Sequence, residues 1–168
     1  NIFNKIIIVT NSLKIKKILN EYKAKVILSK KKHYNGTSRA AEVSKNFNYD
    51  FAFVLFSDEP FIDPKKIRIC KNKIKSLAKF DVINVTTNIK KNDLRSRQVV
   101  KCVIDKDKRI INYFRTKKNY NYKKNTIQKS SGILIFKKKT LQNFTKLKLK
   151  KREKKDKIEE FKFLENNL

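Results

Sequence analysis

Six apolar residues occupy positions 51–56 without interruption. A run of this kind predicts a strand that is buried on both faces, as the central strands of parallel sheets are. It ends in Ser57-Asp58-Glu59-Pro60, so two carboxylates lie where the predicted strand leaves the sheet. Because ligands of open α/β sheets bind at the carboxyl ends of strands, we interpret this segment as the edge of an active site. A solvated turn after a core strand is the alternative that the pattern leaves open.

The chain before this strand has the pattern of a β-α-β unit. Short β-branched runs at residues 5–10 and 24–28 predict two strands, and Ser12 offers an N-cap for a helix between them. Such units connect strands that run parallel to each other. The sequence therefore predicts that its first two strands pair in parallel.

A loop around Gly36 precedes the next predicted helix. Thr37 or Ser38 can cap this helix, whose apolar positions extend to Phe47. Free backbone N–H groups at such a helix start would suit a phosphate or a base carbonyl. A turn followed by a helix cap is the simpler interpretation of these residues when they are considered alone.

Helical and extended patterns alternate after residue 60. Asp63 and Pro64 predict the start of a helix. The other predicted elements are strands at residues 81–86 and 130–136, a hairpin of residues 99–105 and 109–115, and helices at residues 140–147 and 156–165. Residues 117–129 have little hydrophobic content and are predicted to form a mobile loop. Residues 148–157 are dense with charge and are predicted to form a solvated connector. With no repeat and no domain boundary, the pattern predicts one α/β domain over residues 1–168, with a mostly parallel central sheet and a hairpin excursion.

Composition narrows the classes of function. The chain has 44 Lys and Arg residues against 15 acidic ones, a net charge of +29. Clustered basic residues would favour nucleic acid as a partner. Here the lysines are spread along the chain together with many Asn and Ile residues, which A/T-rich codons favour, so we do not expect nucleic-acid binding. A polyanion-binding protein is kept as an alternative.

No apolar run is long enough to cross a bilayer, and we predict a cytoplasmic protein.

Few residues are available for thiol or imidazole chemistry. Cys70 and Cys102 lack the spacing of metal ligands, and we predict that both are reduced and lie in the core. His33 is the only histidine, which excludes a His-based metal cluster and a Ser-His-Asp triad with spare members. The chain contains no methionine, even at position 1, and we expect that its natural start is missing.

Several short motifs follow one another along the chain. Residues 33–43 have the sequence HYNGTSRAAEV, and residues 56–64 have the sequence FSDEPFIDP. Further motifs lie at residues 100–109, 113–116, 130–134 and 155–166. Together they resemble the 3-deoxy-manno-octulosonate cytidylyltransferase family, also called CMP-Kdo synthetases, with its blocks H-x-S-G-T-D/E-R-x-A-E-V and Q-G-D-E-P-x-I-x-P. The resemblance covers nearly the whole chain.

This resemblance implies a Rossmann-like three-layer nucleotide-diphospho-sugar transferase fold and a nucleotidyl transfer. CTP and the acidic sugar 3-deoxy-manno-octulosonate (Kdo) would be joined to CMP-Kdo for lipopolysaccharide biosynthesis, with release of pyrophosphate. Mg²⁺ would neutralise the charge that develops on the phosphates. Members of the family are commonly dimeric, so a homodimer is implied as well.

The resemblance also implies roles for individual residues. They are Asp58 as the metal ligand; Asn35, Gly36 and Thr37 against the nucleotide; Arg39 and Arg115 as catalytic arginines that meet phosphate or the sugar carboxylate; and Ser130 and Glu159 at the sugar. Arginine suits such contacts because its planar fork binds an anion through two parallel hydrogen bonds.

Four positions depart from the family pattern. They are Phe56 in place of Gln, Ser57 in place of Gly, Ser130 in place of His and Glu160 in place of Gln. The family's R-x-P-G-K-P loop and its V-D-T segment have no counterpart in these residues, and we expect that the 168 residues do not catalyse the reaction alone. The alternatives are another CMP-sugar synthetase and a degenerate, non-catalytic nucleotide-binding module of Rossmann-like fold.

Overall fold

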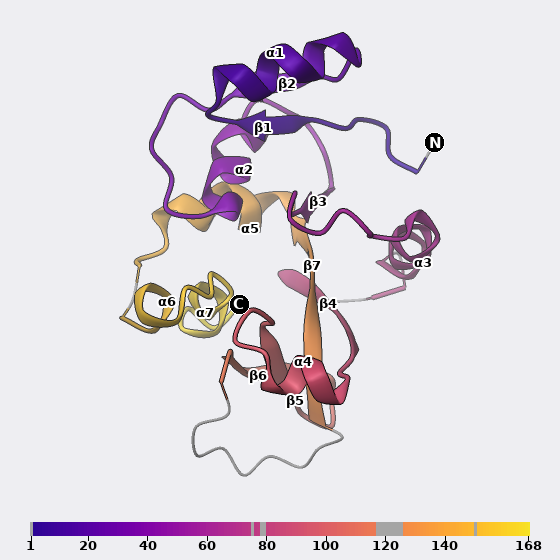
Figure 1. Ribbon diagram of the computed structural model, residues 1–168, viewed down its shortest axis with the longest axis vertical. Coiled ribbons are helices and arrows are strands. Elements are labelled where there is room, and N and C mark those ends of the chain that lie inside the picture. The colour runs from indigo at the N-terminus through magenta and orange to yellow at the C-terminus, as the bar shows by residue number, and fades with distance from the viewer. Residues whose placement is uncertain (1, 75, 78–79, 117–125, 150) are drawn as a thin grey trace.

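The computed structural model describes residues 2–74, 76–77, 80–116, 126–149 and 151–168. Its elements, in chain order, are β1 (Ile8–Thr10), α1 (Leu13–Glu21), β2 (Val26–Leu28), α2 (Gly36–Ser44), β3 (Phe51–Leu55), α3 (Pro64–Ile74), β4 (Val82–Asn88), α4 (Lys91–Arg95), β5 (Lys101–Ile104), β6 (Ile110–Phe114), β7 (Ile127–Lys137), α5 (Lys138–Asn143), the 3₁₀-helix η2 (Phe144–Lys146), α6 (Lys151–Asp156) and α7 (Phe161–Leu164). The strands form a two-stranded sheet and a five-stranded sheet (Figure 1). The predicted mix of helices and strands is confirmed.

β7 is the strand around which the larger sheet is built. Its residue Leu134 pairs with Val54 of β3 on one side and with Asn84 of β4 on the other. Further along, β7 pairs with β5, which in turn pairs with β6 as the predicted hairpin. All these pairs are antiparallel, so β3 and β4 run parallel to each other with β7 between them.

Two expectations about the sheet are therefore wrong for the described strands. The larger sheet is not mostly parallel, because β7 enters it antiparallel to three neighbours. β3 is not a central strand either, since β7 is the only strand with which it is paired among the described residues, and Phe51 and Leu55 are 40% and 41% exposed. The parallel pair predicted for the first two strands is confirmed, because β1 and β2 pair in parallel and Ser12 caps α1 by accepting from the Ile15 backbone N–H.

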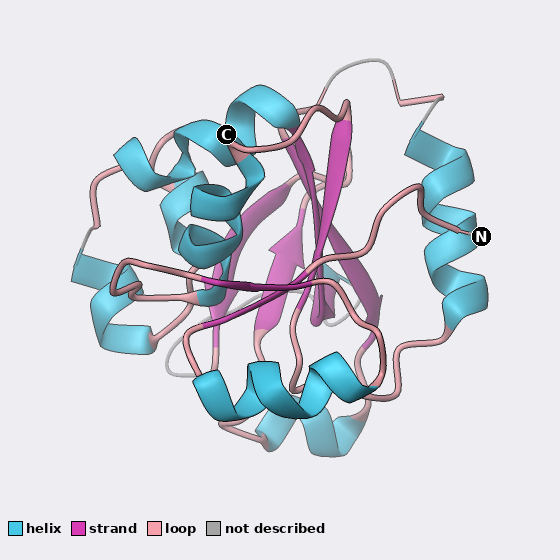
Figure 2. Ribbon diagram, turned by 90° about the horizontal axis from the view of Figure 1, so that it is seen from above, coloured by secondary structure: helices cyan, strands magenta, loops and turns pink. Residues whose placement is uncertain are grey.

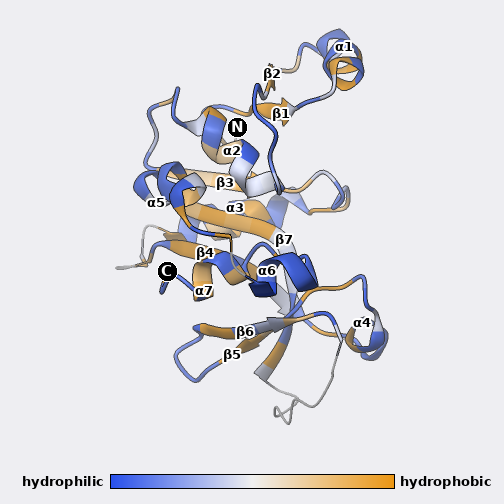
Figure 3. Ribbon diagram, turned by 90° about the vertical axis from the view of Figure 1, so that its left-hand side faces the viewer, coloured by the Kyte–Doolittle hydropathy of each residue, from blue (hydrophilic) through white to orange (hydrophobic). Residues whose placement is uncertain are grey.

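Helices cover both faces of the five-stranded sheet, which gives the predicted three layers (Figure 2). Successive residues of β7 point to opposite faces, as in any strand. Leu134 and Phe136 pack with residues of α2, α5 and α7, whereas Ile133 and Ile135 pack with residues of α3. β7 is accordingly apolar where it crosses the middle of the molecule (Figure 3). Of the two cysteines, both free as predicted, Cys102 is buried and Cys70 is half-buried.

The C-terminal segment differs from the single helix predicted over residues 156–165. The structure has the short helices α6 and α7, and Lys157 between them adopts a positive φ of 51°. This left-handed residue stops α6, because an α-helix needs negative φ throughout. The predicted helix at residues 140–147 is likewise split into α5 and η2. The break at Lys157 turns Glu159 and Glu160 toward the rest of the domain.

No helix among the described residues is long and apolar enough to cross a membrane. Residues 117–125 of the predicted mobile loop lie outside the described residues.

Candidate active site

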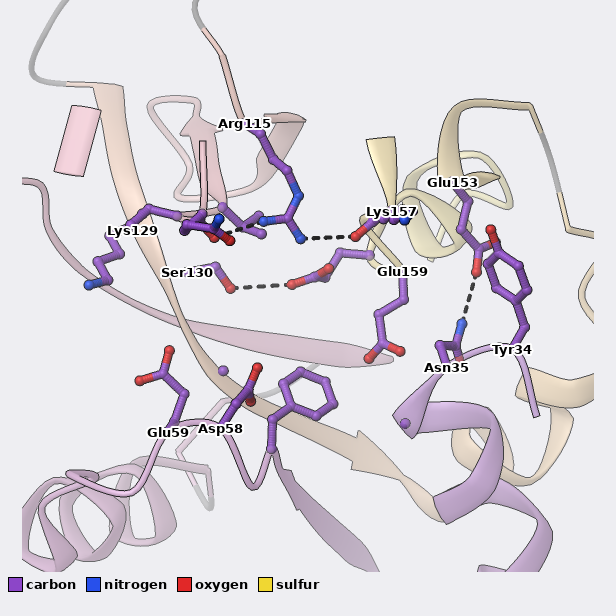
Figure 4. Close-up of a pocket in the computed structure, with 17 residues that line it drawn as sticks. Tyr34, Asn35, Asp58, Glu59, Arg115, Lys129, Ser130, Glu153, Lys157 and Glu159 are labelled. Carbon is purple, nitrogen blue, oxygen red and sulfur yellow. Dashed lines mark hydrogen bonds between the residues drawn. The ribbon is translucent and has the colours of Figure 1, made fainter. Parts of the chain in front are cut away.

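A cavity of about 620 Å³ opens at the end of β3, where the two predicted carboxylates lie (Figure 4). Its walls come from six separate parts of the chain: the start of α2, the turn after β3, the segment before β5, the end of β6, the middle of β7, and the α6–α7 segment. Six of the predicted site residues line it: Asn35, Gly36, Asp58, Arg115, Ser130 and Glu159. The fold therefore gathers residues that are up to 124 positions apart in the sequence, from Asn35 to Glu159, around one cavity.

Asp58 and its neighbour Glu59 supply the carboxylates of the β3 side. Both are exposed residues that line the cavity. The described residues include no group of three His, Cys, Asp or Glu side chains that could hold a metal ion alone. Mg²⁺ is usually held by one or two carboxylates together with waters and substrate phosphates, and Asp58 fits this mode.

Asn35 caps α2, a role that we predicted for Thr37 or Ser38. Its Oδ1 accepts from the Ser38 backbone N–H at 2.9 Å, while its Nδ2 donates to Glu153 Oε1 at 2.8 Å. Glu153 is only 1% exposed, and its other oxygen, Oε2, has no hydrogen-bond partner among the described residues. Burial raises the pKa of this carboxyl. The expected solvated connector at residues 148–157 therefore contains a buried acid of the cavity wall.

Thr37 joins the start of α2 to the α6–α7 segment. Its Oγ1 donates to Glu159 Oε1 at 2.5 Å, and its backbone N–H donates to Glu159 Oε2 at 3.3 Å. Burial of Glu159, and then the nearby Glu160 carboxyl, raise the pKa of Glu159 to about 7 against the opposing effect of the two Thr37 hydrogen bonds. The side chain of Thr37 is fully buried and does not line the cavity, so its hydroxyl hydrogen-bonds Glu159 and does not contact a ligand in the cavity.

Ser130 lies on β7 beside a second buried acid. Its Oγ is 3.3 Å from Glu160 Oε1 and 3.1 Å from Asn84 Oδ1, so its single proton serves one of these acceptors at a time. Glu160 is 5% exposed, and burial raises its pKa. Ser130 and Glu160 occupy two of the positions that depart from the family pattern, and the structure places them in contact.

Arg115 organises the wall of the cavity opposite β3. Its guanidinium donates to the backbone carbonyls of Gln98 at 2.7 Å and of Asp156 and Lys157 at 3.0 Å each. The fully buried Lys101 ammonium donates to the carbonyl of Arg115 at 2.5 Å and to that of Ser96. We expected the Arg115 guanidinium to meet a phosphate or a carboxylate, but it is directed at backbone oxygens. Its hydrogen bonds connect the segment before β5 to the α6–α7 turn.

Arg39 and Thr37 are the predicted site residues that do not line the cavity. Arg39 is half-buried in α2, and its Nε has no hydrogen-bond partner among the described residues. His33, which precedes the cavity loop, forms a 2.5 Å contact between its Nε2 and Glu42 Oε2. This contact fixes the loop against α2 and lowers the pKa of the Glu42 carboxyl through hydrogen bonding.

The sequence analysis did not identify three charged residues that line the cavity. They are Lys129, Glu153 and Lys157. Glu59, the second carboxylate predicted after the strand, lines the cavity together with Asp58. Glu153 stands alone among four basic neighbours, a pattern that is typical of a solvated surface, so no local signal could identify it as buried. Lys129 and Lys157 add positive charge to the cavity wall.

Comparisons with known proteins agree on one family. The family model described as cytidylyltransferase matches residues 1–168. The 3-deoxy-manno-octulosonate cytidylyltransferase of Elusimicrobium minutum is 28% identical over 171 residues, which cover 98% of this chain and 70% of the relative. The enzyme of the same name from Christiangramia forsetii is 32% identical over 178 residues, which cover 98% of this chain and 68% of the relative.

A solved structure gives the same agreement at the level of the fold. The structure of CMP:2-keto-3-deoxy-manno-octonic acid synthetase complexed with CTP superposes with a TM-score of 0.84 at 19% identity. The match covers 97% of this chain and 68% of that one. This likeness confirms the predicted Rossmann-like α/β fold of a nucleotidyltransferase.

Proposed function

The chain belongs to the cytidylyltransferase family, and from this premise we propose that it joins CTP and Kdo to give CMP-Kdo and pyrophosphate for lipopolysaccharide biosynthesis in the cytoplasm. The anomeric hydroxyl oxygen of the sugar forms a bond to the α-phosphorus of CTP. The bond between that phosphorus and the oxygen bridging to the β-phosphate breaks, pyrophosphate leaves with the electron pair, and the hydroxyl gives up its proton.

The observation that carries this proposal is the convergence of residues on one cavity. Asn35, Gly36, Asp58, Ser130 and Glu159 come from four segments that the motifs singled out, and all of them line the space after β3. A structural turn after β3 would not require these distant segments to meet. Concave sites with a few convergent polar groups are where small ligands bind.

Charge in the cavity suits two anionic substrates. Lys129, Lys157 and Arg115 line it and reduce the repulsion between a triphosphate and an acidic sugar. Asp58 would hold a divalent cation, which we propose to be Mg²⁺, and this ion supplies charge neutralisation at the phosphates when bound. Asn35 and Gly36, at the start of α2, are proposed to contact the nucleotide.

The sugar is proposed to lie on the side of Ser130, Glu159 and Glu160. The two carboxyl groups are acceptors for sugar hydroxyls. With a pKa near 7, Glu159 can take up or release a proton at neutral pH, as a general acid or base requires. Arg39 has no part in this proposal, because it does not line the cavity.

Binding of CTP with Mg²⁺ tests the proposal directly. We expect CTP with Mg²⁺ to raise the melting temperature of the chain, and we expect Asp58→Ala to remove the part of this rise that depends on the metal. Asp107→Ala, which removes an exposed carboxylate in the β5–β6 turn, is the matched control and should leave the rise unchanged. An Asp58→Ala variant that keeps the full metal-dependent rise would contradict the assignment of Asp58. The homodimer stays a prediction, to be checked by light scattering.

A further inference from the structure

Phe56 lies between the two glycines of the chain in the wall of the cavity. A Cβ atom on Gly36 would stand 3.2 Å from Phe56 Cε1 and 3.4 Å from Cδ1. A Cβ atom on Gly132 would stand 3.6 Å from Phe56 Cδ2. Because Cδ1 and Cδ2 belong to opposite edges of the ring, a glycine borders the ring on each side.

These three residues form one strip of the cavity wall. Gly36, Phe56 and Gly132 all line the cavity, and neither glycine has a side chain of its own beside the ring; the nearest other side chain on the Gly132 side is that of Glu59, whose Cγ lies 2.8 Å from the position of a Gly132 Cβ. The strip is apolar, because the ring contributes only carbon and hydrogen. It therefore offers contact to a ligand that has a flat, apolar face.

The polar groups around the strip favour a sugar over a base. Ser130, Glu159 and Glu160 line the same cavity and bring two carboxyl groups and a hydroxyl. Carboxyl oxygens can accept more than one hydrogen bond each, so Glu159 and Glu160 can take further donors beside those from Thr37 and Ser130. A sugar brings several hydroxyls as donors, whereas the cytosine base has a single amino group to donate. A pyranose also has a face of C–H groups, and the methylene of a 3-deoxy sugar enlarges it.

We propose that Phe56 stacks on the C–H face of the acceptor sugar and is thereby a specificity-determining residue of this site. The proposal rests on the proposed function, since that function supplies the sugar. It gives a physical reason for the departure at position 56: where the family pattern has an amide, this chain makes an apolar contact. The acceptor therefore presents C–H groups, and no hydrogen-bonding group, to position 56.

Ligand NMR can observe this contact directly. With Kdo as the probe and the full chain as the protein, saturation of the aromatic protons should transfer to the ring protons of the sugar. Phe56→Leu should abolish this transfer and raise the Kd for Kdo about tenfold, while Phe56→Tyr should preserve both. Tyr34→Leu removes the other aromatic ring that lines the cavity among the described residues, and it should leave the transfer intact.

Phe61→Leu is the matched control for the substitution itself. Phe61 is five positions further along the chain, is 97% exposed and does not line the cavity, so this variant should behave as wild type. Transfer to the H5 and H6 protons of CTP in place of the sugar protons would overturn the proposal, as would transfer to Kdo that survives in Phe56→Leu. If Phe56→Leu does not fold, the wild-type spectrum still decides which ligand the ring contacts, with Tyr34→Leu excluding the other ring.

The stacking proposal and the proposed function can fail separately. Stabilisation by CTP with Mg²⁺ does not depend on the ring and should be equal in wild type and Phe56→Leu. Loss of this stabilisation in wild type would count against the cytidylyl transfer, while aromatic transfer to Kdo would still support the contact. Conversely, normal stabilisation by CTP without any aromatic transfer to Kdo would refute the contact alone.

Discussion

Thr37 holds Glu159 across 122 positions of the sequence, through its hydroxyl at 2.5 Å and its backbone N–H at 3.3 Å. Both groups belong to the first turn of α2, where backbone N–H groups lack helical partners. Glu159 satisfies one of these donors and at the same time closes one side of the cavity. One pair of residues thus joins the start of α2 to the C-terminal segment.

Removal of the Thr37 hydroxyl should destabilise the domain. Thr37→Val keeps the shape of the side chain but removes the hydrogen bond to Oε1 of the half-buried Glu159, which should lower the free energy of unfolding by about 1 kcal/mol. Thr37→Ser keeps the hydroxyl and is the control, with a smaller loss. Urea unfolding of the three proteins measures the difference. Equal losses in both variants would show that the methyl group, and not the hydroxyl, matters.

The pKa of Glu159 makes part of the stability depend on pH. Because this pKa is raised from 4.5 to about 7 in the folded state, the folded protein binds more protons than the unfolded chain between these values. The stabilising contribution of the protonated group is complete below pH 4.5 and is lost as the pH rises through 7. Relative to Glu159→Gln, wild type should lose up to about 3 kcal/mol of unfolding free energy between pH 4.5 and 8.

This comparison needs its own control, because other carboxyl groups also titrate. Glu21→Gln changes an exposed acid at the end of α1, and the difference between this variant and wild type should stay constant over the same pH range. A constant difference for Glu159→Gln as well would mean that Glu159 keeps its ordinary pKa in the folded protein.

Local signals of the sequence located most of the elements. The apolar run before Asp58 is a strand, Ser12 caps α1, and residues 101–104 and 110–114 form the predicted hairpin. Each of these features depends on residues close together in the chain. The motif order also identified six residues that the fold brings to one cavity.

Features that depend on contacts between distant residues could not be predicted from local sequence patterns. The apolar content of β3 did not reveal that β7 would pair with it antiparallel, because pairing is decided by the whole sheet. The apolar spacing of residues 156–165 fits a helix, but positive φ at Lys157 interrupts it so that Glu159 reaches Thr37. Burial of Glu153 follows from its contact with Asn35, which is 118 positions away.

Arg115 should matter for stability through its backbone contacts. Arg115→Lys replaces the planar fork by one ammonium, which cannot reach the carbonyls of Gln98, Asp156 and Lys157 at once. We expect a loss of about 2 kcal/mol in unfolding free energy, together with faster amide hydrogen exchange around residues 97–98 and 156–157. Arg109→Lys, on the exposed end of the β5–β6 hairpin, should change neither. Unchanged exchange in Arg115→Lys would refute the structural role.

Gly132 should tolerate a methyl group less well than Gly36. Gly132 has a φ of +68°, where an L-residue is strained by about 1–2 kcal/mol, and its Cβ would lie 2.8 Å from Glu59 Cγ. Gly36 has no such backbone strain, and its Cβ would meet only the Phe56 ring at 3.2 Å. Gly132→Ala should therefore lose more unfolding free energy than Gly36→Ala, by about 1–2 kcal/mol.

The double variant Gly132→Ala/Glu59→Ala separates the two causes, because it relieves the contact and leaves the backbone strain. Urea unfolding should show that Gly132→Ala costs less unfolding free energy in the Glu59→Ala background than in wild type, but still costs some. If Gly132→Ala costs nothing in that background, the whole loss comes from the contact with Glu59. If it costs as much as in wild type, the whole loss comes from the backbone strain.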